Sequence, residues 1–125
     1  MHFSKHYTLT EARALLPQVR QWLDKLDSCQ KHLQTLEETL GAVVASGDDA
    51  GGEPVNQLAR SVCEMQDVVL QFQRREIQIK DVRRGLIDFP SLREGREVFL
   101  CWEKEEDDIE FWHDLETGYA GRERL

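Results

Sequence analysis

The chain has 125 residues and a formal net charge of −8, from 16 lysine and arginine residues against 24 aspartate and glutamate residues. This length suits one domain with a modest core, and the acidic balance argues against general binding to nucleic acids or anionic membranes, which needs a basic surface. Three widely spaced cysteines indicate reduced thiols, and neither a membrane span nor a signal-peptide core is evident, so we expect a cytoplasmic protein.

A long amphipathic helix is predicted over residues 9–45, after a short N-terminal arm at residues 1–8. Thr8 and Glu11 have the spacing of a capping box, which places the helix start at Leu9. We expect Pro17 to bend this helix without ending it. Ten apolar residues at alternating spacings of three and four predict one continuous stripe for packing against another helix: Ala12, Leu15, Val19, Trp22, Leu26, Cys29, Leu33, Leu36, Leu40 and Val43.

A second helix is predicted over residues 54–84, after a loop at residues 46–53 that is rich in glycine and aspartate. Its apolar stripe has the same spacing and is interrupted only by Glu76, and Gly85 would supply a left-handed cap. The short loop implies an antiparallel helical hairpin in which Trp22 would lie beside Glu76. Five apolar residues flank the two stripes or lie outside them, and they need a further covering surface: Leu16, Leu23, Leu70, Ile77 and Trp112.

The last third of the chain changes to the two-residue period of β-strands. Residues 85–96 are predicted as an extended linker, residues 97–113 as a β-hairpin with an acidic turn, and residues 114–125 as an irregular tail. Pairing Trp102 with Ile109 places Val98 opposite His113, and it puts His113 and Cys101 on opposite faces of the hairpin. The predicted fold class is therefore α+β and mostly α, with a coiled-coil-like antiparallel helical hairpin followed by a β-hairpin.

Several motifs occur together at both ends of the chain. They are YTLTEARALLPQVR near the N-terminus, then GLIDFP, GREVFLCW, IEFWH and GYAGR between Gly85 and Arg122. In this order they resemble the uncharacterised prokaryotic family catalogued as domain of unknown function 2203. Here Glu105 stands where the turn of that family usually has glycine. The resemblance implies a small cytoplasmic protein of the same fold, and it carries no established activity, cofactor or catalytic residue.

Polar residues in the motif-bearing segment form the candidate site. They would converge as a pocket for a small anion, or serve as cap and turn partners for irregular backbone: Asp88, Arg96, Glu106, His113 and Arg122. Cys101 and His113 come nearest to metal ligands, yet two ligands fall short of a zinc site, so neither a metal nor another cofactor is predicted. No phosphate-binding loop or nucleophile motif is present, and no residue is assigned a catalytic role.

Two functional hypotheses follow from these patterns. The first is a non-enzymatic interaction module that forms a homodimer and binds another protein. A homodimer is expected because two helices alone leave flanking apolar residues uncovered. The alternative is a small-molecule or metal-binding protein, possibly a hydrolase, with a polar site around His113.

Overall fold

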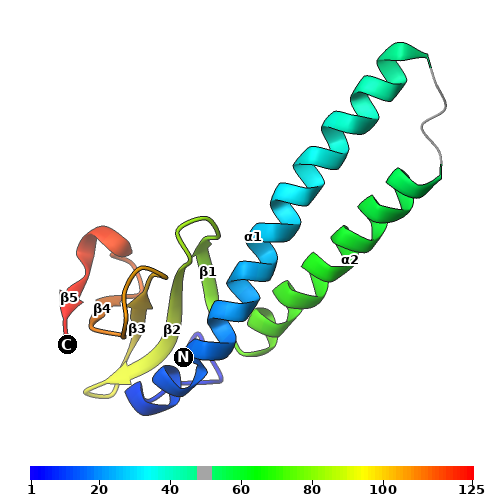
Figure 1. Cartoon of the computed structure of the whole chain (residues 1–125). Coiled ribbons are helices and arrows are strands. Elements are labelled where there is room, and N and C mark those ends of the chain that lie inside the picture. The colour runs from blue at the N-terminus through cyan, green and yellow to red at the C-terminus, as the bar shows by residue number, and fades with distance from the viewer. Residues whose placement is uncertain (48–51) are drawn as a thin grey trace.

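The computed structural model describes residues 1–47 and 52–125. Helices α1 (Leu9–Ser46) and α2 (Glu53–Arg74) run antiparallel (Figure 1). One antiparallel sheet follows, with its strands in chain order: β1 (Gln78–Asp81), β2 (Leu86–Arg93), β3 (Arg96–Trp102), β4 (Phe111–Asp114) and β5 (Glu123–Arg124). A short 3-10 helix, η1 (Tyr119–Gly121), precedes β5. The predicted fold class, α+β and mostly α, is confirmed.

Helix α1 forms as its sequence predicts. The Thr8 hydroxyl accepts the Glu11 amide at 3.1 Å, and the Glu11 carboxylate accepts the Thr8 amide at 2.9 Å, which completes the capping box. The helix continues through Pro17 and ends at Gly47, which is left-handed with φ 83°. All ten residues of the predicted stripe are buried or half-buried. Figure 1 shows α1 running beside α2, with its N-terminal part also beside the sheet, and the buried residues of that part belong to the core they share.

Helix α2 ends ten residues before the predicted boundary at residue 84. The chain turns at Glu76, whose φ is 58°, and the Ile77 amide bonds back to the Phe72 carbonyl at 3.1 Å. Residues 78–81 then form β1 where helix was predicted, with Ile79 opposite Ile87. Strand is favoured over helix here because Ile77 packs in the sheet core and the Glu76 carboxylate accepts two backbone amides of the N-terminal arm.

The earlier helix end also shifts the pairing between the helices. Trp22 lies against Phe72, with ring centroids 5.4 Å apart, and not beside Glu76 as predicted. Farther along, the His32 ring bonds the Ser61 hydroxyl at 2.8 Å. Of the apolar stripe predicted for this helix, Phe72 is buried as expected, whereas Ser61 and Val68 are buried in place of the neighbouring predicted positions Val62 and Val69.

The sheet is larger than the predicted hairpin. The predicted linker at residues 85–96 contains β2, which is paired with both β1 and β3, and the predicted irregular tail at residues 114–125 contains η1 and β5. A two-residue turn at Glu94 and Gly95, both with positive φ, joins β2 to β3.

The predicted register of the β3–β4 hairpin is wrong by one residue. Leu100 pairs with Trp112 and Phe99 pairs with His113, whereas the prediction paired Val98 with His113. This register puts Trp112 on the core face with Leu100 and turns His113 to the opposite face. The acidic turn fixes the register: the Trp102 indole donates to the Glu106 carbonyl at 2.9 Å, and Arg20 donates to the Lys104 and Glu106 carbonyls.

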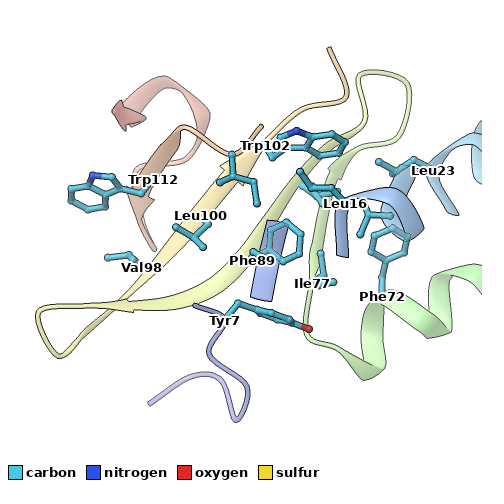
Figure 2. Close-up of a cluster of buried hydrophobic side chains, with 14 of the residues drawn as sticks. Tyr7, Leu16, Leu23, Phe72, Ile77, Phe89, Val98, Leu100, Trp102 and Trp112 are labelled. Atoms are coloured by element: carbon cyan, nitrogen blue, oxygen red, sulfur yellow. The ribbon is translucent and has the colours of Figure 1, made fainter. Parts of the chain in front are cut away.

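The core lies between the sheet and the nearer halves of the helices. Phe89 stands at its centre, with Tyr7, Leu16 and Ile77 around it, as Figure 2 shows. Of the flanking residues that required a cover, Leu16, Leu23, Ile77 and Trp112 are buried by this packing, whereas Leu70 stays 38% exposed. Within the described ranges, no helix combines the length and apolar character needed to cross a membrane.

Candidate functional site

Three side chains that can bind metals meet on the face of the sheet opposite the core. Asp88 comes from β2, Cys101 from β3 and His113 from β4, and Asp88 pairs directly with Cys101 across the strands. A carboxylate oxygen, the sulfur and a ring nitrogen all lie within 4.8 Å of one another. The three residues are 1%, 1% and 2% exposed, so the cluster is closed to bulk solvent.

Two hydrogen bonds fix the His113 ring. Nδ1–H donates to the Asp114 carbonyl at 2.6 Å, and Nε2 lies 3.0 Å from Asp88 Oδ2. Burial lowers the pKa of His113, but the bonds to Asp88 and to the Asp114 carbonyl outweigh it and raise the pKa above its ordinary value. The Asp88 carboxylate beside Nε2 therefore favours the protonated form of the imidazole.

Asp88 is incompletely paired. Among the described residues, its Oδ1 is a buried polar atom without a hydrogen-bond partner. A buried carboxylate oxygen in this state is costly, because it has lost its water and has gained no donor in exchange. Among the described residues of the cluster, this oxygen is the one buried polar side-chain atom without a hydrogen-bond partner.

Cys101 is not set up as a nucleophile. Burial and the nearby Asp88 carboxylate raise the pKa of the Cys101 thiol to about 12, although Arg122 acts in the opposite direction. The thiol therefore stays protonated at neutral pH, and nucleophilic chemistry requires the thiolate. The cluster thus offers ligand atoms and no activated nucleophile.

Arg122 and Glu106 lie next to this cluster. The Arg122 guanidinium donates to both oxygens of Glu106, at 3.0 and 3.1 Å, and it stacks between the rings of Phe111 and Tyr119. Arg122 also lies close enough to Cys101 to act against the rise in the pKa of that thiol. The pair ties the acidic turn to the segment around η1, beside the sulfur.

The structure therefore brings together four of the five predicted site residues, in two adjoining pairs, Asp88 with His113 and Arg122 with Glu106. Arg96 lies apart: its exposed side chain pairs with the Asp114 carboxylate at 3.2 Å. Sequence reasoning missed the meeting of Cys101 with Asp88 and His113, because the strand at residues 86–93 was taken for a linker and the hairpin register was off by one. The available signal was Asp88 itself, a lone acid inside the apolar run LIDFP.

A second candidate surface lies on α2. One side of this helix is exposed yet has no charged residue, over roughly one third of the circumference. The charged residues of α2 all lie toward another side: Glu53, Arg60, Glu64, Asp67 and Arg74. We call the exposed members of the uncharged side the neutral face; they are Val55, Ala59, Val62, Cys63, Gln66, Leu70 and Gln73.

The model of a family described as an uncharacterised conserved protein, DUF2203, matches residues 5–125. No curated protein and no solved structure matches the chain. The match covers both helices, the sheet and the cluster on its outer face.

Proposed function

We propose that this chain, which belongs to the DUF2203 family of uncharacterised conserved proteins, is a non-enzymatic cytoplasmic interaction module that forms a homodimer through its helical hairpin. The observation that carries the proposal is the neutral face of α2. Charged residues make up 32% of the chain, so an exposed helix face without any of them is unexpected on a surface that only meets water.

The neutral face has the composition of a helix–helix contact. Val55 is 43% exposed, Val62 37% and Leu70 38%, and small or uncharged residues separate them. The heptad spacing of Val55, Val62 and half-buried Val69 is the spacing with which one helix packs along another. Val44, near the end of α1, is also exposed, at 63%.

A second copy of the chain is the partner that this face fits. Each copy has a net charge of −8, so two copies approach most easily through a surface that brings no carboxylates together. In a two-fold dimer the same patch meets itself, and a patch without charge cannot meet a like charge. The 22 residues of α2 span roughly 33 Å, which is enough for four helices to pack side by side along the hairpins.

Cys63 makes this arrangement testable. It is exposed, and it lies at the middle of α2 on the edge of the neutral face. When two α2 helices pack antiparallel about a two-fold axis at their midpoints, the two Cys63 side chains lie near that axis. Mild oxidation should therefore give a disulfide-linked dimer, and Cys63→Ser should abolish it. The other thiols, Cys29 and Cys101, are buried.

Light scattering during size-exclusion chromatography tests the dimer directly. We expect twice the 14.6 kDa mass of one chain at tens of micromolar, and a shift to monomer in Val62→Glu, which places a carboxylate in the neutral face. Gln34→Glu adds the same charge at an exposed position of α1 and should leave the dimer intact. A monomeric wild type, or equal behaviour of the two variants, would overturn the proposal.

The cytoplasmic part of the proposal is supported by the cysteines. All three are free thiols, which fits a reducing compartment. A dimer of this kind presents two outward-facing sheets at the ends of a helical core, a form suited to holding protein partners at a fixed separation.

A further inference from the structure

We propose that Asp88, Cys101 and His113 form a binding site for one divalent transition-metal ion, and that Zn²⁺ is the ion that suits these ligands best. The site lies on the sheet and does not involve the neutral face of α2, so the test of the metal site is independent of the test of the dimer. It offers one carboxylate oxygen, one cysteine sulfur and one imidazole nitrogen, the three donor types that proteins use for zinc.

The positions of the donor atoms suit one shared ion. His113 Nε2 and Asp88 Oδ2 are 3.0 Å apart, and no pair within the cluster exceeds 4.8 Å. Two ligands of a tetrahedral zinc ion, with bonds of about 2.0 to 2.3 Å, lie about 3.3 to 3.8 Å apart. The largest separation in the cluster exceeds this range by only about 1 Å.

The imidazole is held as a metal-binding histidine is held. In metal sites the ring nitrogen that does not bind the ion usually donates to a carbonyl or carboxylate, which fixes the ring. Here Nδ1–H donates to the Asp114 carbonyl at 2.6 Å, and Nε2 therefore points at Asp88 and Cys101. The three ligands also come from adjacent strands joined by backbone hydrogen bonds, a rigid support for a site.

The unpaired oxygen of Asp88 is the independent sign that something is missing from this cluster. Oδ1 is buried and has no hydrogen-bond partner in the described part of the chain. A cation bound beside the carboxylate would give this oxygen a partner.

The charges also balance. A Zn²⁺ ion bound by one thiolate and one carboxylate leaves the buried cluster neutral overall. The Arg122 guanidinium beside the cluster pairs with Glu106 at 3.0 Å, so it adds no uncompensated charge. Three protein ligands leave a fourth position for water or another small ligand.

The test is titration of the full chain, first freed of metal by a chelator, with Zn²⁺ and with Co²⁺ as a spectroscopic probe. We expect one ion per chain, a higher melting temperature with Zn²⁺, and, with Co²⁺, the visible bands of a tetrahedral ion and a thiolate-to-metal charge-transfer band. Cys101→Ser should lose the charge-transfer band and bind about 100-fold more weakly or worse, and Asp88→Asn should also bind more weakly.

Two control variants make the result specific. The double variant Cys29→Ser, Cys63→Ser keeps Cys101 as its one thiol and should retain the charge-transfer band. The double variant His2→Gln, His6→Gln removes the histidines of the N-terminal arm and should retain binding. The proposal is overturned if wild type takes up no stoichiometric metal, if Cys101→Ser keeps the charge-transfer band, or if binding disappears with the arm histidines.

Discussion

Glu97 fastens the N-terminal arm to the sheet. Its carboxylate accepts the backbone amides of His2 and Phe3, at 2.7 and 3.0 Å, and bonds the His6 ring at 2.8 Å. Phe3 then lies edge-on to Phe99, with ring centroids 5.4 Å apart. Burial raises the pKa of Glu97, but these hydrogen bonds outweigh it and lower the pKa to about 2. The ionised carboxylate therefore stabilises the folded arm.

The sign of this shift gives a pH prediction. A carboxyl with a depressed pKa in the folded state contributes stability above its ordinary value of 4.5, and loses it as the pH falls toward 2. We expect Glu97→Gln to unfold at a lower urea concentration than wild type at pH 7, with the difference shrinking between about pH 4.5 and 2.

Urea unfolding of both proteins from pH 7 to pH 2 measures this effect. Glu105→Gln, which neutralises an exposed residue of the acidic turn, controls for the change in net charge. A difference between Glu97→Gln and wild type that stays constant across this range would mean that the ionised carboxylate does not hold the arm. Faster proteolysis of residues 1–8 in Glu97→Gln would be an independent sign of its release.

At the scale of elements, the sequence specifies best what depends on near neighbours. Helix α1 was predictable because its signals are local in sequence. The capping box joins residues three positions apart, and the stripe from Ala12 to Val43 is recognised from spacings of three and four residues. The end of α2 was not, because the spacing of three and four continues through Glu76 to Ile79. What ends the helix is distant in sequence: the amides of Ser4 and Lys5 on the Glu76 carboxylate, and the Tyr7 hydroxyl on the Arg75 carbonyl.

The candidate site was predictable in its members and not in its assembly. Asp88, His113 and Arg122 stood out because they lie within the motif-bearing segment. Whether His113 shares a face with Cys101 depends on a shift of one residue, since strand side chains alternate. That shift is decided by the contacts of Arg20 with the Lys104 and Glu106 carbonyls, which join α1 to the acidic turn across more than eighty residues.

Two glycines in tight turns yield a prediction: Gly85 lies between β1 and β2, and Gly95 lies between β2 and β3. Gly85 and Gly95 both have positive φ, at 66° and 77°, so alanine at either position costs about 1 to 2 kcal/mol of backbone strain. At Gly85 a Cβ would also lie 2.6 Å from Lys104 Cβ, whereas at Gly95 it would meet nothing within 4 Å. We expect Gly85→Ala to destabilise the protein by about 1 to 3 kcal/mol more than Gly95→Ala.

Chemical denaturation of the two variants, side by side with wild type, measures the difference. Gly95→Ala is the matched control, because it carries the backbone strain without the steric contact. Equal losses of stability would show that the β1–β2 turn moves freely away from Lys104, and that the acidic turn is not packed against it.

At the scale of the whole molecule, the two halves of the helical hairpin are supported unequally. The N-terminal part of α1 contacts both α2 and the sheet, and Leu16, Val19, Leu23 and Leu26 are all buried there. Beyond Cys29, the one fully buried residue of α1 in the described range is Leu36. Figure 1 shows this outer part of the hairpin standing clear of the sheet. In a single chain it is therefore held by one helix–helix stripe alone.

Hydrogen exchange should report this inequality. In monomeric Val62→Glu, amides of residues 31–46 should open locally and have protection factors about tenfold or more below those of residues 16–26 and of β2, because local opening exposes little buried apolar surface. In wild type, packing of a second copy along α2 should raise protection across residues 53–70 and the facing part of α1, more so as the concentration rises. Uniform protection along α1 in the Val62→Glu variant would mean that the outer hairpin is as stable as the core without a partner, which removes the physical need for one.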